Sequence, residues 1–155
     1  MLNHVLILLL FVCQLSPTDQ NRALEIHNNA RAAVCVPPLS WSNQLAAEAQ
    51  AYAETLAKKG AFEHSNSGDG ENLYWYSATA TTPYSDASES WLEEIHDYHH
   101  GRNWARNFSE IGHYSQMVWS DTKQIGIGVA IASDGSTYVV ARYHPAGNYT
   151  NRLPY

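Results

Sequence analysis

Histidine and glutamate side chains at four positions of this chain have the chemistry of a metal site. Residues 112–119 place a histidine beside polar residues and then run into the apolar triplet Met-Val-Trp, which is typical of a histidine at the edge of a packed core. Two glutamates and a second histidine lie upstream. The candidate site residues are His64, Glu71, Glu94 and His113. If they share one cleft, they would suit a divalent cation such as Zn²⁺, bound through the imidazoles.

Spacing alone leaves two alternatives to a metal site open. The same residues could provide a general base and a general acid, since imidazoles and carboxylates are the groups that enzymes use most often for proton transfer. Alternatively, four polar residues spread over about fifty positions never meet in the fold.

Two other motifs resemble known sites but lack an essential part. His96 and His100 are four positions apart, as in the H-E-x-x-H zinc motif, but aspartate follows His96 where that motif needs glutamate, and the helix is about to end. We therefore expect a solvated helix end there. Gly126 and Gly128 lack the third glycine and the following helix of a nucleotide-binding loop, which predicts a strand with a close backbone approach instead.

Two amphipathic patterns near the start of the chain predict helices. The first covers residues 19–34, with Asp19 as its cap, and it ends before two consecutive prolines. The second begins at the cap residue Ser40 and covers residues 40–59, where Gly60 stops it.

The remainder of the chain changes from helical to β-strand periodicity. A third helix opens at Ser85 or Asp86 and runs to about residue 98, and a brief helical turn is expected at residues 113–118. The predicted strands are residues 72–76, 124–131 and 137–144, the last two joined by an Asp-Gly hairpin. Helices that precede a terminal hairpin indicate an α+β domain in which helices cover an antiparallel sheet.

The composition is that of one acidic globular domain. A chain of 155 residues has the size of a single domain with one core. Its net charge is −6, and its nine basic residues are scattered along the sequence. This excludes the basic patch that attracts nucleic acid or an anionic membrane surface, so we expect no nucleic-acid partner.

The start of the chain is predicted to be a secretory signal peptide, and the alternative is a buried N-terminal strand. Residues 5–12 form an apolar run of eight, too short for a membrane span of about 20 residues. This divides the chain into a leader, residues 1–16, and one domain, residues 17–155, with no transmembrane span in the mature chain. Loss of the leader removes Cys13, so Cys35 would be either buried or free for intermolecular pairing.

Two N-glycosylation sequons agree with an extracellular location. They are Asn107-Phe108-Ser109 and Asn148-Tyr149-Thr150, which predict Asn107 and Asn148 as acceptors. Because sequons are common by chance, each adds little by itself.

Several motifs, at matched order and spacing, resemble those of the CAP superfamily, which comprises cysteine-rich secretory proteins, antigen 5 and class-1 pathogenesis-related proteins of plants. The run His27-Asn28-Asn29-Ala30-Arg31 is similar to the family's H-N-x-x-R, and Gly70-Glu71-Asn72-Leu73 is similar to its G-E-N-[ILV]. Residues 112–119 and 143–149 fit the two family signatures, and residues 38–46 resemble a run of the plant and fungal members. The resemblance covers roughly residues 22–150.

The resemblance implies a three-layer α-β-α sandwich around a small antiparallel sheet. It also implies that the family's cleft tetrad falls on His64, Glu71, Glu94 and His113, with Glu94 three residues after Trp91. One departure is Ala141, which stands two residues before the tyrosine of the second signature, where the family usually has cysteine. The family's disulfides are therefore absent from this chain.

The resemblance further implies a secreted, non-enzymatic protein of the pathogenesis-related type that binds sterol or a related lipid. The matching lipid region, residues 74–84, is rich in aromatic residues and free of charge, as suits a flat apolar ligand. Alternatively, these rings pack on neighbouring helices. The candidate lipid-binding residues of this region are Tyr74, Trp75, Tyr76 and Tyr84. The alternatives are a metal-dependent hydrolase that uses the tetrad, and a signalling or defence ligand whose tail, residues 145–155, is recognised by an extracellular receptor. We expect a monomer, with Zn²⁺ or another divalent cation in the cleft.

Overall fold

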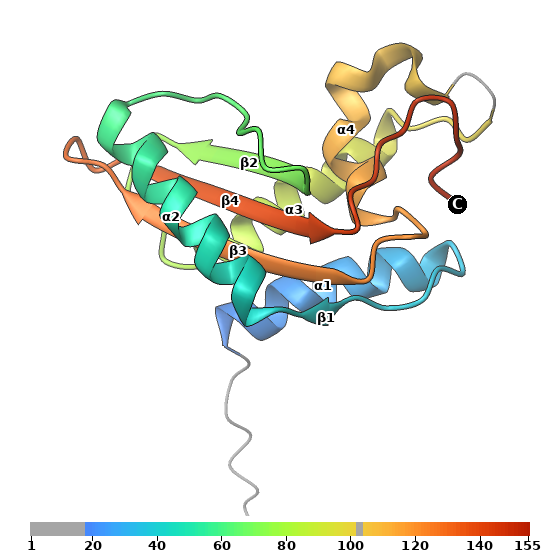
Figure 1. Ribbon diagram of the computed structural model, residues 1–155, viewed down its shortest axis with the longest axis horizontal. Coiled ribbons are helices and arrows are strands. Elements are labelled where there is room, and N and C mark those ends of the chain that lie inside the picture. The colour runs from blue at the N-terminus through green and yellow to red at the C-terminus, as the bar shows by residue number, and fades with distance from the viewer. Residues whose placement is uncertain (1–17, 102–103) are drawn as a thin grey trace, which may run out of the picture.

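The computed structural model describes residues 18–101 and 104–155, so the predicted leader lies outside the described residues. The chain folds as three layers around a four-stranded sheet, as expected (Figure 1). The helices are α1 (Asp19–Ala33), α2 (Asn43–Lys59), α3 (Pro83–Glu93) and α4 (Phe108–Met117), with short 3-10 helices at Glu94–His96 and Trp104–Asn107. The strands are β1 (Ser40–Trp41), β2 (Gly70–Tyr76), β3 (Gln124–Ile131) and β4 (Thr137–His144).

The sheet has the order β1-β3-β4-β2, so β2 forms one of its edges. Strands β3 and β4 have the predicted bounds and form an antiparallel hairpin, and β2 pairs antiparallel with β4. The two-residue strand β1 was not predicted, and it pairs parallel with β3, so the sheet is not purely antiparallel. Within the described ranges, no helix is both long enough and apolar enough to cross a bilayer.

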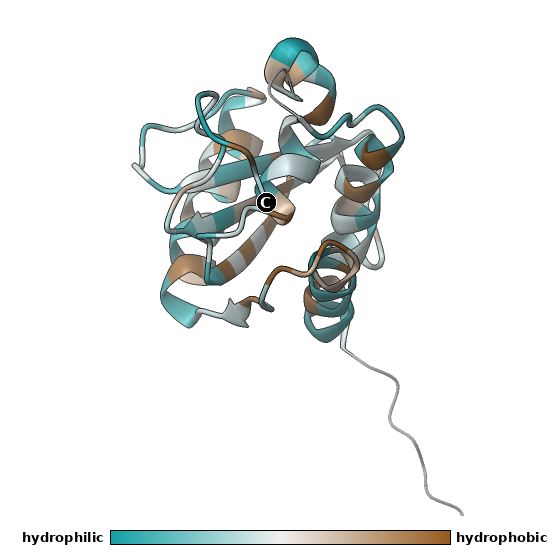
Figure 2. Cartoon of the chain, turned by 90° about the vertical axis from the view of Figure 1, so that its right-hand side faces the viewer, coloured by the Kyte–Doolittle hydropathy of each residue, from teal (hydrophilic) through white to brown (hydrophobic). Residues whose placement is uncertain are grey.

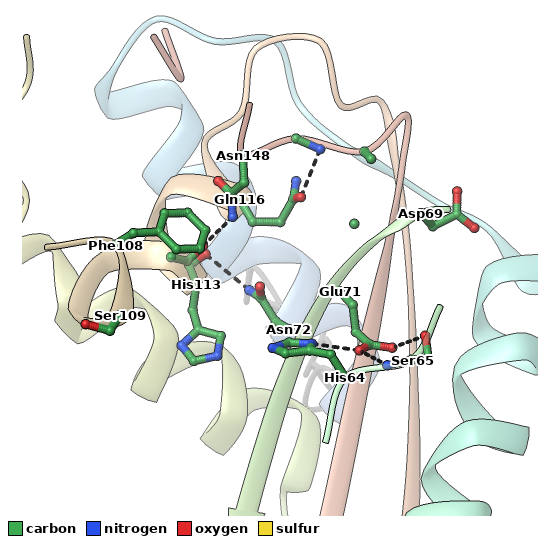
Figure 3. A pocket seen from close by; sticks show the side chains of 14 residues that line it. His64, Ser65, Asp69, Glu71, Asn72, Phe108, Ser109, His113, Gln116 and Asn148 are labelled. Carbon is green, nitrogen blue, oxygen red and sulfur yellow. Dashed lines mark hydrogen bonds and ion pairs between the residues drawn. The ribbon is translucent and has the colours of Figure 1, made fainter. Parts of the chain in front are cut away.

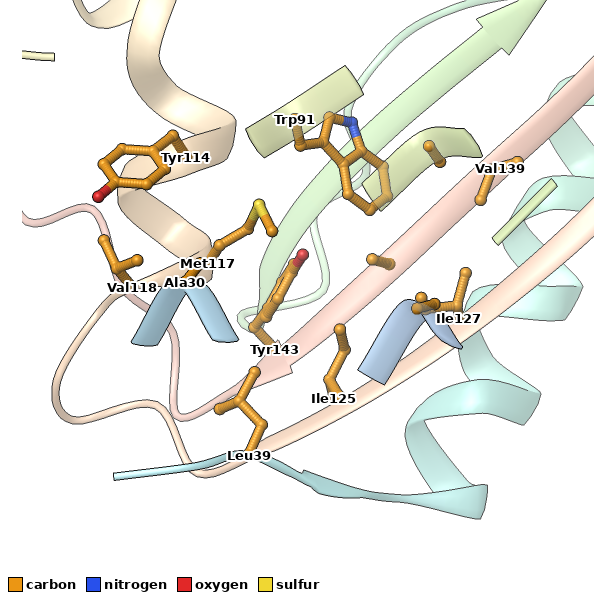
Figure 4. Close-up of a cluster of buried hydrophobic side chains, with 13 residues drawn as sticks. Ala30, Leu39, Trp91, Tyr114, Met117, Val118, Ile125, Ile127, Val139 and Tyr143 are labelled. Atoms are coloured by element: carbon orange, nitrogen blue, oxygen red, sulfur yellow. The ribbon is translucent and has the colours of Figure 1, made fainter. Parts of the chain in front are cut away.

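The side chains of β4 point alternately to the two faces of the sheet and contribute to a hydrophobic core on each face. Tyr138 and Val140 pack against α2, whereas Val139, Ala141 and Tyr143 face α1 and α3 (Figure 4). This follows from the strand period of two, which directs successive side chains to opposite faces. Apolar residues accordingly recur along the strands and on the helices (Figure 2).

Helix α2 lies very close to the sheet because β3 carries two glycines. A Cβ atom on Gly126 would lie 2.8 Å from Cα of Ala46, and one on Gly128 would lie 2.6 Å from the carbonyl carbon of Ala49. The close backbone approach predicted from these glycines is therefore confirmed, and it is an approach to a helix.

The two N-terminal helix caps differ from the prediction by a few residues. The hydroxyl of Thr18, not Asp19, caps α1 by accepting a hydrogen bond from Asn21 N at 3.2 Å. The predicted cap of α2 was Ser40, but Ser42 takes that position because Ser40 belongs to β1. The predicted stop is confirmed, since Gly60 adopts the left-handed conformation with φ +61°.

Asp19 caps a different helix. Its carboxylate accepts hydrogen bonds from the backbone N–H of Tyr84 (2.8 Å) and Ser85 (3.0 Å), in the first turn of α3. Helix α3 begins at Pro83, two residues before the predicted start at Ser85. It ends at Glu93, before the predicted end at about residue 98. The brief turn predicted at residues 113–118 is the second half of a longer helix, α4.

Arg31 connects α1 to the end of α4 and to the segment that follows it. Its buried guanidinium donates to four backbone carbonyls, those of Pro37 (2.7 Å), Met117 (3.0 Å), Trp119 (2.8 Å) and Thr122 (2.8 Å). Burial lowers its pKa from 12.5 to about 10, so it remains cationic at neutral pH. The arginine of the H-N-x-x-R run thus positions the end of the helix that carries His113.

Candidate functional site

The candidate site lies along the free edge of β2. Two cavities follow this edge in succession, one of about 370 Å³ and one of about 700 Å³. We call the first the polar cavity, whose lining includes His64, Glu71, Asn72, Phe108, His113 and Asn148 (Figure 3). The second, the aromatic cavity, has a lining that includes Phe62, Leu73, Tyr74, Trp75, Trp91 and Tyr138.

The segment before β2 supplies the first histidine–carboxylate pair. Nδ1 of His64 donates to Oε1 of Glu71 at 2.7 Å. Ser65 donates to the same carboxylate through its backbone N–H (2.9 Å) and its hydroxyl (2.8 Å), and Arg142 lies 3.1 Å from Oε2. Burial raises the pKa of Glu71, but these hydrogen bonds and the guanidinium outweigh burial, so its pKa lies below the ordinary value. The hydrogen bond to Glu71 raises the pKa of His64.

The second pair joins the end of α3 to α4. Nδ1 of His113 donates to Oε1 of Glu94 at 2.5 Å. The other carboxylate oxygen accepts from the backbone N–H groups of His113 (2.8 Å) and Tyr114 (2.9 Å). The indole of Trp91 stacks on the imidazole, with centroids 6.1 Å apart and planes 25° from parallel. Glu94 and Trp91 therefore fix both the plane and the tautomer of His113.

In both histidine–carboxylate pairs, Nε2 of the imidazole is available to bind a further group. Each imidazole donates its Nδ1–H to a carboxylate, so Nε2 carries the lone pair, and in the described part of the chain neither Nε2 has a hydrogen-bond partner. His64 reaches the polar cavity from the loop before β2, and His113 reaches it from α4 (Figure 3).

The four predicted residues lie along one groove, but as two pairs rather than four equivalent ligands. His64, Glu71 and His113 line the polar cavity, whereas Glu94 lies behind His113 and lines the aromatic cavity. Over residues 18–101 and 104–155, no group of three or more His, Cys, Asp or Glu side chains is arranged to hold a metal ion. Glu71 and Glu94, two of the candidate metal-binding residues, each accept a hydrogen bond from one of the two imidazoles.

A buried network connects the polar cavity to α1. His27 donates from Nδ1 to Ala23 O (2.8 Å), and its Nε2 accepts from the hydroxyl of Tyr143 (2.9 Å). Asn72 donates from Nδ2 to that hydroxyl and to His113 O, both at 3.1 Å. Burial lowers the pKa of His27 to about 4, so its ring is neutral. Asn72 follows Glu71 in the G-E-N motif but was not predicted as a site residue.

The predicted lipid-binding residues do not all share one location. Tyr74 and Trp75 line the aromatic cavity. Tyr76, 45% exposed, is not part of its lining, and Tyr84 stacks on Trp41 at 6.3 Å between centroids instead. Phe62, Leu73 and Tyr138 also line this cavity but were not predicted as lipid-binding residues.

His96 and His100 do not form the alternative zinc motif. His96 lies in the 3-10 helix after α3, and its Nε2 lies 3.7 Å from the carboxylate of Glu93. His100 lies beyond that helix, where it stacks on Tyr155 with centroids 4.6 Å apart. Both are exposed, in agreement with the expected solvated helix end.

The predicted glycosylation sites are half-buried, and Cys35 is exposed. Nδ2 of Asn148 donates to Gly112 O at 2.8 Å inside the molecule, so a glycan there would have to fit between α4 and the C-terminal segment. Nδ2 of Asn107 makes longer hydrogen bonds, 3.2 and 3.4 Å, near the surface. Cys35 lies in the turn after α1 with φ +58°, so of its two predicted states it has the one that can pair between molecules.

The fold and the two histidine–carboxylate pairs define the class of protein. The chain belongs to the cysteine-rich secretory protein family, CAP, whose family model matches residues 24–143. The resemblance found in the sequence is thereby confirmed.

Individual relatives come from animals and plants. The chain is 42% identical over 141 residues to human Golgi-associated plant pathogenesis-related protein 1, covering 84% of this chain and 85% of that protein. It is 38% identical over 137 residues to tobacco pathogenesis-related protein 1C, covering 88% of this chain and 81% of that protein. Among solved structures, that of NaASP2 with Zn²⁺ has a TM-score of 0.76 at 27% identity and covers 93% of this chain and 88% of that chain.

Proposed function

We propose that this protein binds a divalent metal ion, such as Zn²⁺, through Nε2 of His64 and Nε2 of His113. The observation that carries the proposal is the pair of carboxylate-oriented imidazoles that line one cavity. Histidines that bind metal usually donate the other ring N–H to a carboxylate, which fixes the tautomer and makes the imidazole more basic. Glu71 and Glu94 have this supporting role.

Two imidazole ligands leave coordination positions for water or for a bound molecule. Zn²⁺ is usually four-coordinate in proteins, so two of its positions would face the cavity. The solved structure of the relative NaASP2 with Zn²⁺ agrees with this kind of ligand for the fold.

A zinc titration by calorimetry tests the proposal. We expect the wild type to bind zinc and the His64→Ala/His113→Ala variant to lose binding. The matched control is His96→Ala/His100→Ala, which removes two exposed histidines outside both cavities and should bind zinc as the wild type does. Equal zinc affinity in all three proteins would exclude this site.

We also propose that the aromatic cavity holds sterol or a related lipid. Its volume of about 700 Å³ lies within the roughly 300–1,000 Å³ of pockets for small organic ligands, and aromatic side chains dominate its lining. Quenching of tryptophan fluorescence by a sterol, titrated in detergent-free buffer, measures this binding because Trp75 and Trp91 both line the cavity. A flat titration with wild-type protein would reject the proposal.

Our proposal is for binding rather than for turnover. A hydrolase would need a general base, yet every oxygen of Glu71 and Glu94 accepts a hydrogen bond or faces Arg142. Assays of ester and peptide hydrolysis with zinc-loaded protein compare the two functions. A hydrolytic activity that disappears in both Glu71→Ala and His113→Ala would favour the metal-dependent hydrolase.

Secretion and an extracellular defence role complete the proposal. The apolar run at residues 5–12 supports an extracellular location, although one relative is named as Golgi-associated. The tail proposed for receptor recognition is attached to the domain, since Ser120 N donates to Pro154 O (2.7 Å) and the Trp104 indole donates to Arg152 O (2.6 Å). Fractionation of expressing cells, with sequencing of the N-terminus of the released protein, checks the location and the leader. Size-exclusion chromatography checks the expected monomer.

A further inference from the structure

The two edges of the sheet differ in how their backbone groups are satisfied. At the β3 edge, beyond the short strand β1, the side-chain amide of Gln50 donates to the carbonyl of Val129 at 2.9 Å and accepts from its N–H at 3.0 Å. Strand β2 forms the other edge, and no strand of residues 18–101 and 104–155 lies on its outer side (Figure 1). A side chain thus closes the β3 edge, whereas no strand covers the β2 edge.

Leu73 and Trp75 direct their backbone N–H and C=O groups to the outer side of β2. The hydrogen bond from Ala132 N to Ser136 O, 2.8 Å, sets the phase of the β3–β4 ladder, so that even-numbered residues of β4 face β3 and odd-numbered residues face β2. Even-numbered residues of β2 lie opposite those odd-numbered residues, which leaves the odd-numbered residues of β2 facing outward. In agreement, the carbonyl of Leu73 accepts from the indole N–H of Trp91 at 3.1 Å.

Most of these outward groups are unpaired. Among the described residues, neither the N–H nor the C=O of Trp75 has a hydrogen-bond partner, and the N–H of Leu73 has none either. Leu73 is only 3% exposed, and a buried backbone donor without a partner costs free energy. Both residues line the aromatic cavity. This cavity therefore presents backbone donors and an acceptor as well as aromatic rings.

The walls of the aromatic cavity lie on both sides of the β2 edge. Phe62 comes from the segment after α2, which covers one face of the sheet, whereas Trp91 and Glu94 come from α3 and its end, on the other face. A strand beside β2, at the usual spacing of about 4.8 Å, would run between these walls. An extended peptide can pair with the donor and the acceptor of Trp75 together, which a hydrocarbon cannot do.

The charge of the aromatic cavity favours a basic ligand. Glu94 and Asp134 contribute carboxylates to its lining, and none of the described residues that line it is lysine or arginine. The chain as a whole has a net charge of −6. Complementary charge steers association and rejects partners of like charge, so a basic segment is favoured over an acidic one.

We infer that the β2 edge binds an extended, basic peptide segment of a partner protein by strand addition. The backbone of the segment exchanges hydrogen bonds with the N–H and C=O of Trp75, and an apolar side chain of the segment enters the aromatic cavity against Phe62. In strand addition, main-chain hydrogen bonds give affinity and pockets for alternate side chains give specificity. The inference goes beyond the proposed metal and lipid binding and depends on neither, although a lipid in the same cavity would compete with the peptide.

Backbone N-methylation of a probe peptide tests strand addition directly. The probe is Lys-Thr-Val-Phe-Val-Thr-Lys with both ends blocked, and its affinity for the full chain is measured by calorimetry in the presence of chelator. One derivative is N-methylated at both valines and the other at phenylalanine, so that the two derivatives block alternate sides of the extended peptide. We expect one derivative to bind at least about tenfold more weakly than the parent and the other to bind as the parent does. Replacement of both lysines by glutamate should also weaken binding.

Two variants of β2 place the peptide on the protein. Trp75→Ala removes an aromatic wall of the cavity and should weaken peptide binding. Tyr76→Ala is the matched control, because Tyr76 is similarly exposed, 45% against 47% for Trp75, but does not line the cavity. This variant should bind the peptide as the wild type does, and both variants should bind zinc with unchanged affinity.

The outcomes separate this inference from the proposed function. Equal effects of the two methylation patterns, or no binding of the parent peptide, would overturn strand addition and leave the proposed metal site intact. Concentration-dependent dimerisation that Trp75→Ala abolishes would assign the β2 edge to a second copy of the chain and would also overturn the inference. Absence of zinc or sterol binding removes the corresponding proposal without affecting the peptide result.

Discussion

Glu94 binds His113 twice, through its ring and through its backbone. One carboxylate oxygen accepts from Nδ1 at 2.5 Å, and the other accepts from the backbone N–H at 2.8 Å. Glu94 follows directly after α3, and His113 lies in α4, so this contact also joins the two helices. A single side chain thus sets both the position of α4 and the orientation of its imidazole.

Glu94→Gln should therefore weaken zinc binding without removing it. The amide cannot accept from the ring and from the backbone as strongly as a carboxylate does, and loss of such a supporting group usually costs about 10–100-fold in metal affinity. Calorimetry measures the change. Glu93→Gln is the matched control, because Glu93 is exposed and forms an ion pair with His96, at 3.7 Å, rather than with His113. A similar loss in both variants would contradict the orienting role.

Zinc affinity should increase with pH. The hydrogen bond to Glu71 raises the pKa of His64 above 6.5, and a proton on this ring competes with the metal for the imidazole. Below that raised pKa, each displaced proton should weaken binding by about tenfold per pH unit, and above it the affinity should level off. Zinc titrations in a series of buffers test this. An affinity that does not change between about pH 5.5 and 8 would show that no histidine takes part.

His27 should make the protein less stable in weak acid. Burial lowers its pKa from 6.5 to about 4 in the folded state, so the unfolded chain binds a proton first as the pH falls. The contribution is complete above pH 6.5 and is lost towards pH 4, by about 3 kcal/mol in total.

Urea unfolding of the wild type and of His27→Gln over this pH range isolates the effect. Glutamine keeps an acceptor for the hydroxyl of Tyr143 but does not titrate, so the difference in unfolding free energy should shrink as the pH falls. The carboxylates titrate in both proteins, so their contributions to the unfolding free energy cancel in the difference. Parallel pH profiles would mean that His27 is not buried as a neutral ring.

Gly126→Ala should strongly destabilise the fold. The new methyl group would overlap the backbone of Ala46 in α2, which cannot move away as a flexible side chain can. Overpacking of this kind costs about 1–3 kcal/mol or more. Gly112→Ala is the control, since its Cβ would meet only the ring of Phe108, at 3.2 Å, on the exposed side of α4. Thermal unfolding should show a large decrease for the first variant and little change for the second; equal effects would argue against the close helix–sheet contact.

The sequence by itself determined most of the secondary structure and the residues of the site. Gly60 ends α2, and the bounds of β3 and β4 match their β-rich runs, because conformational preference and side-chain period act over a few neighbouring residues. Glu71 and His113 could be named because they stand in motifs of the family, and Glu94 because it lies three residues after Trp91.

Only the tertiary structure decided how those residues are used. Asp19 caps a helix that begins more than sixty positions later, and Ser42 replaces Ser40 as a cap because β3 draws Ser40 into the sheet. Glu71 and Glu94 accept hydrogen bonds from the two imidazoles. Phe62 and Tyr138 line one cavity together with Trp75. Such contacts depend on the packing of segments far apart in the chain, where the choice of partner is set by the shape of the whole core rather than by local preference.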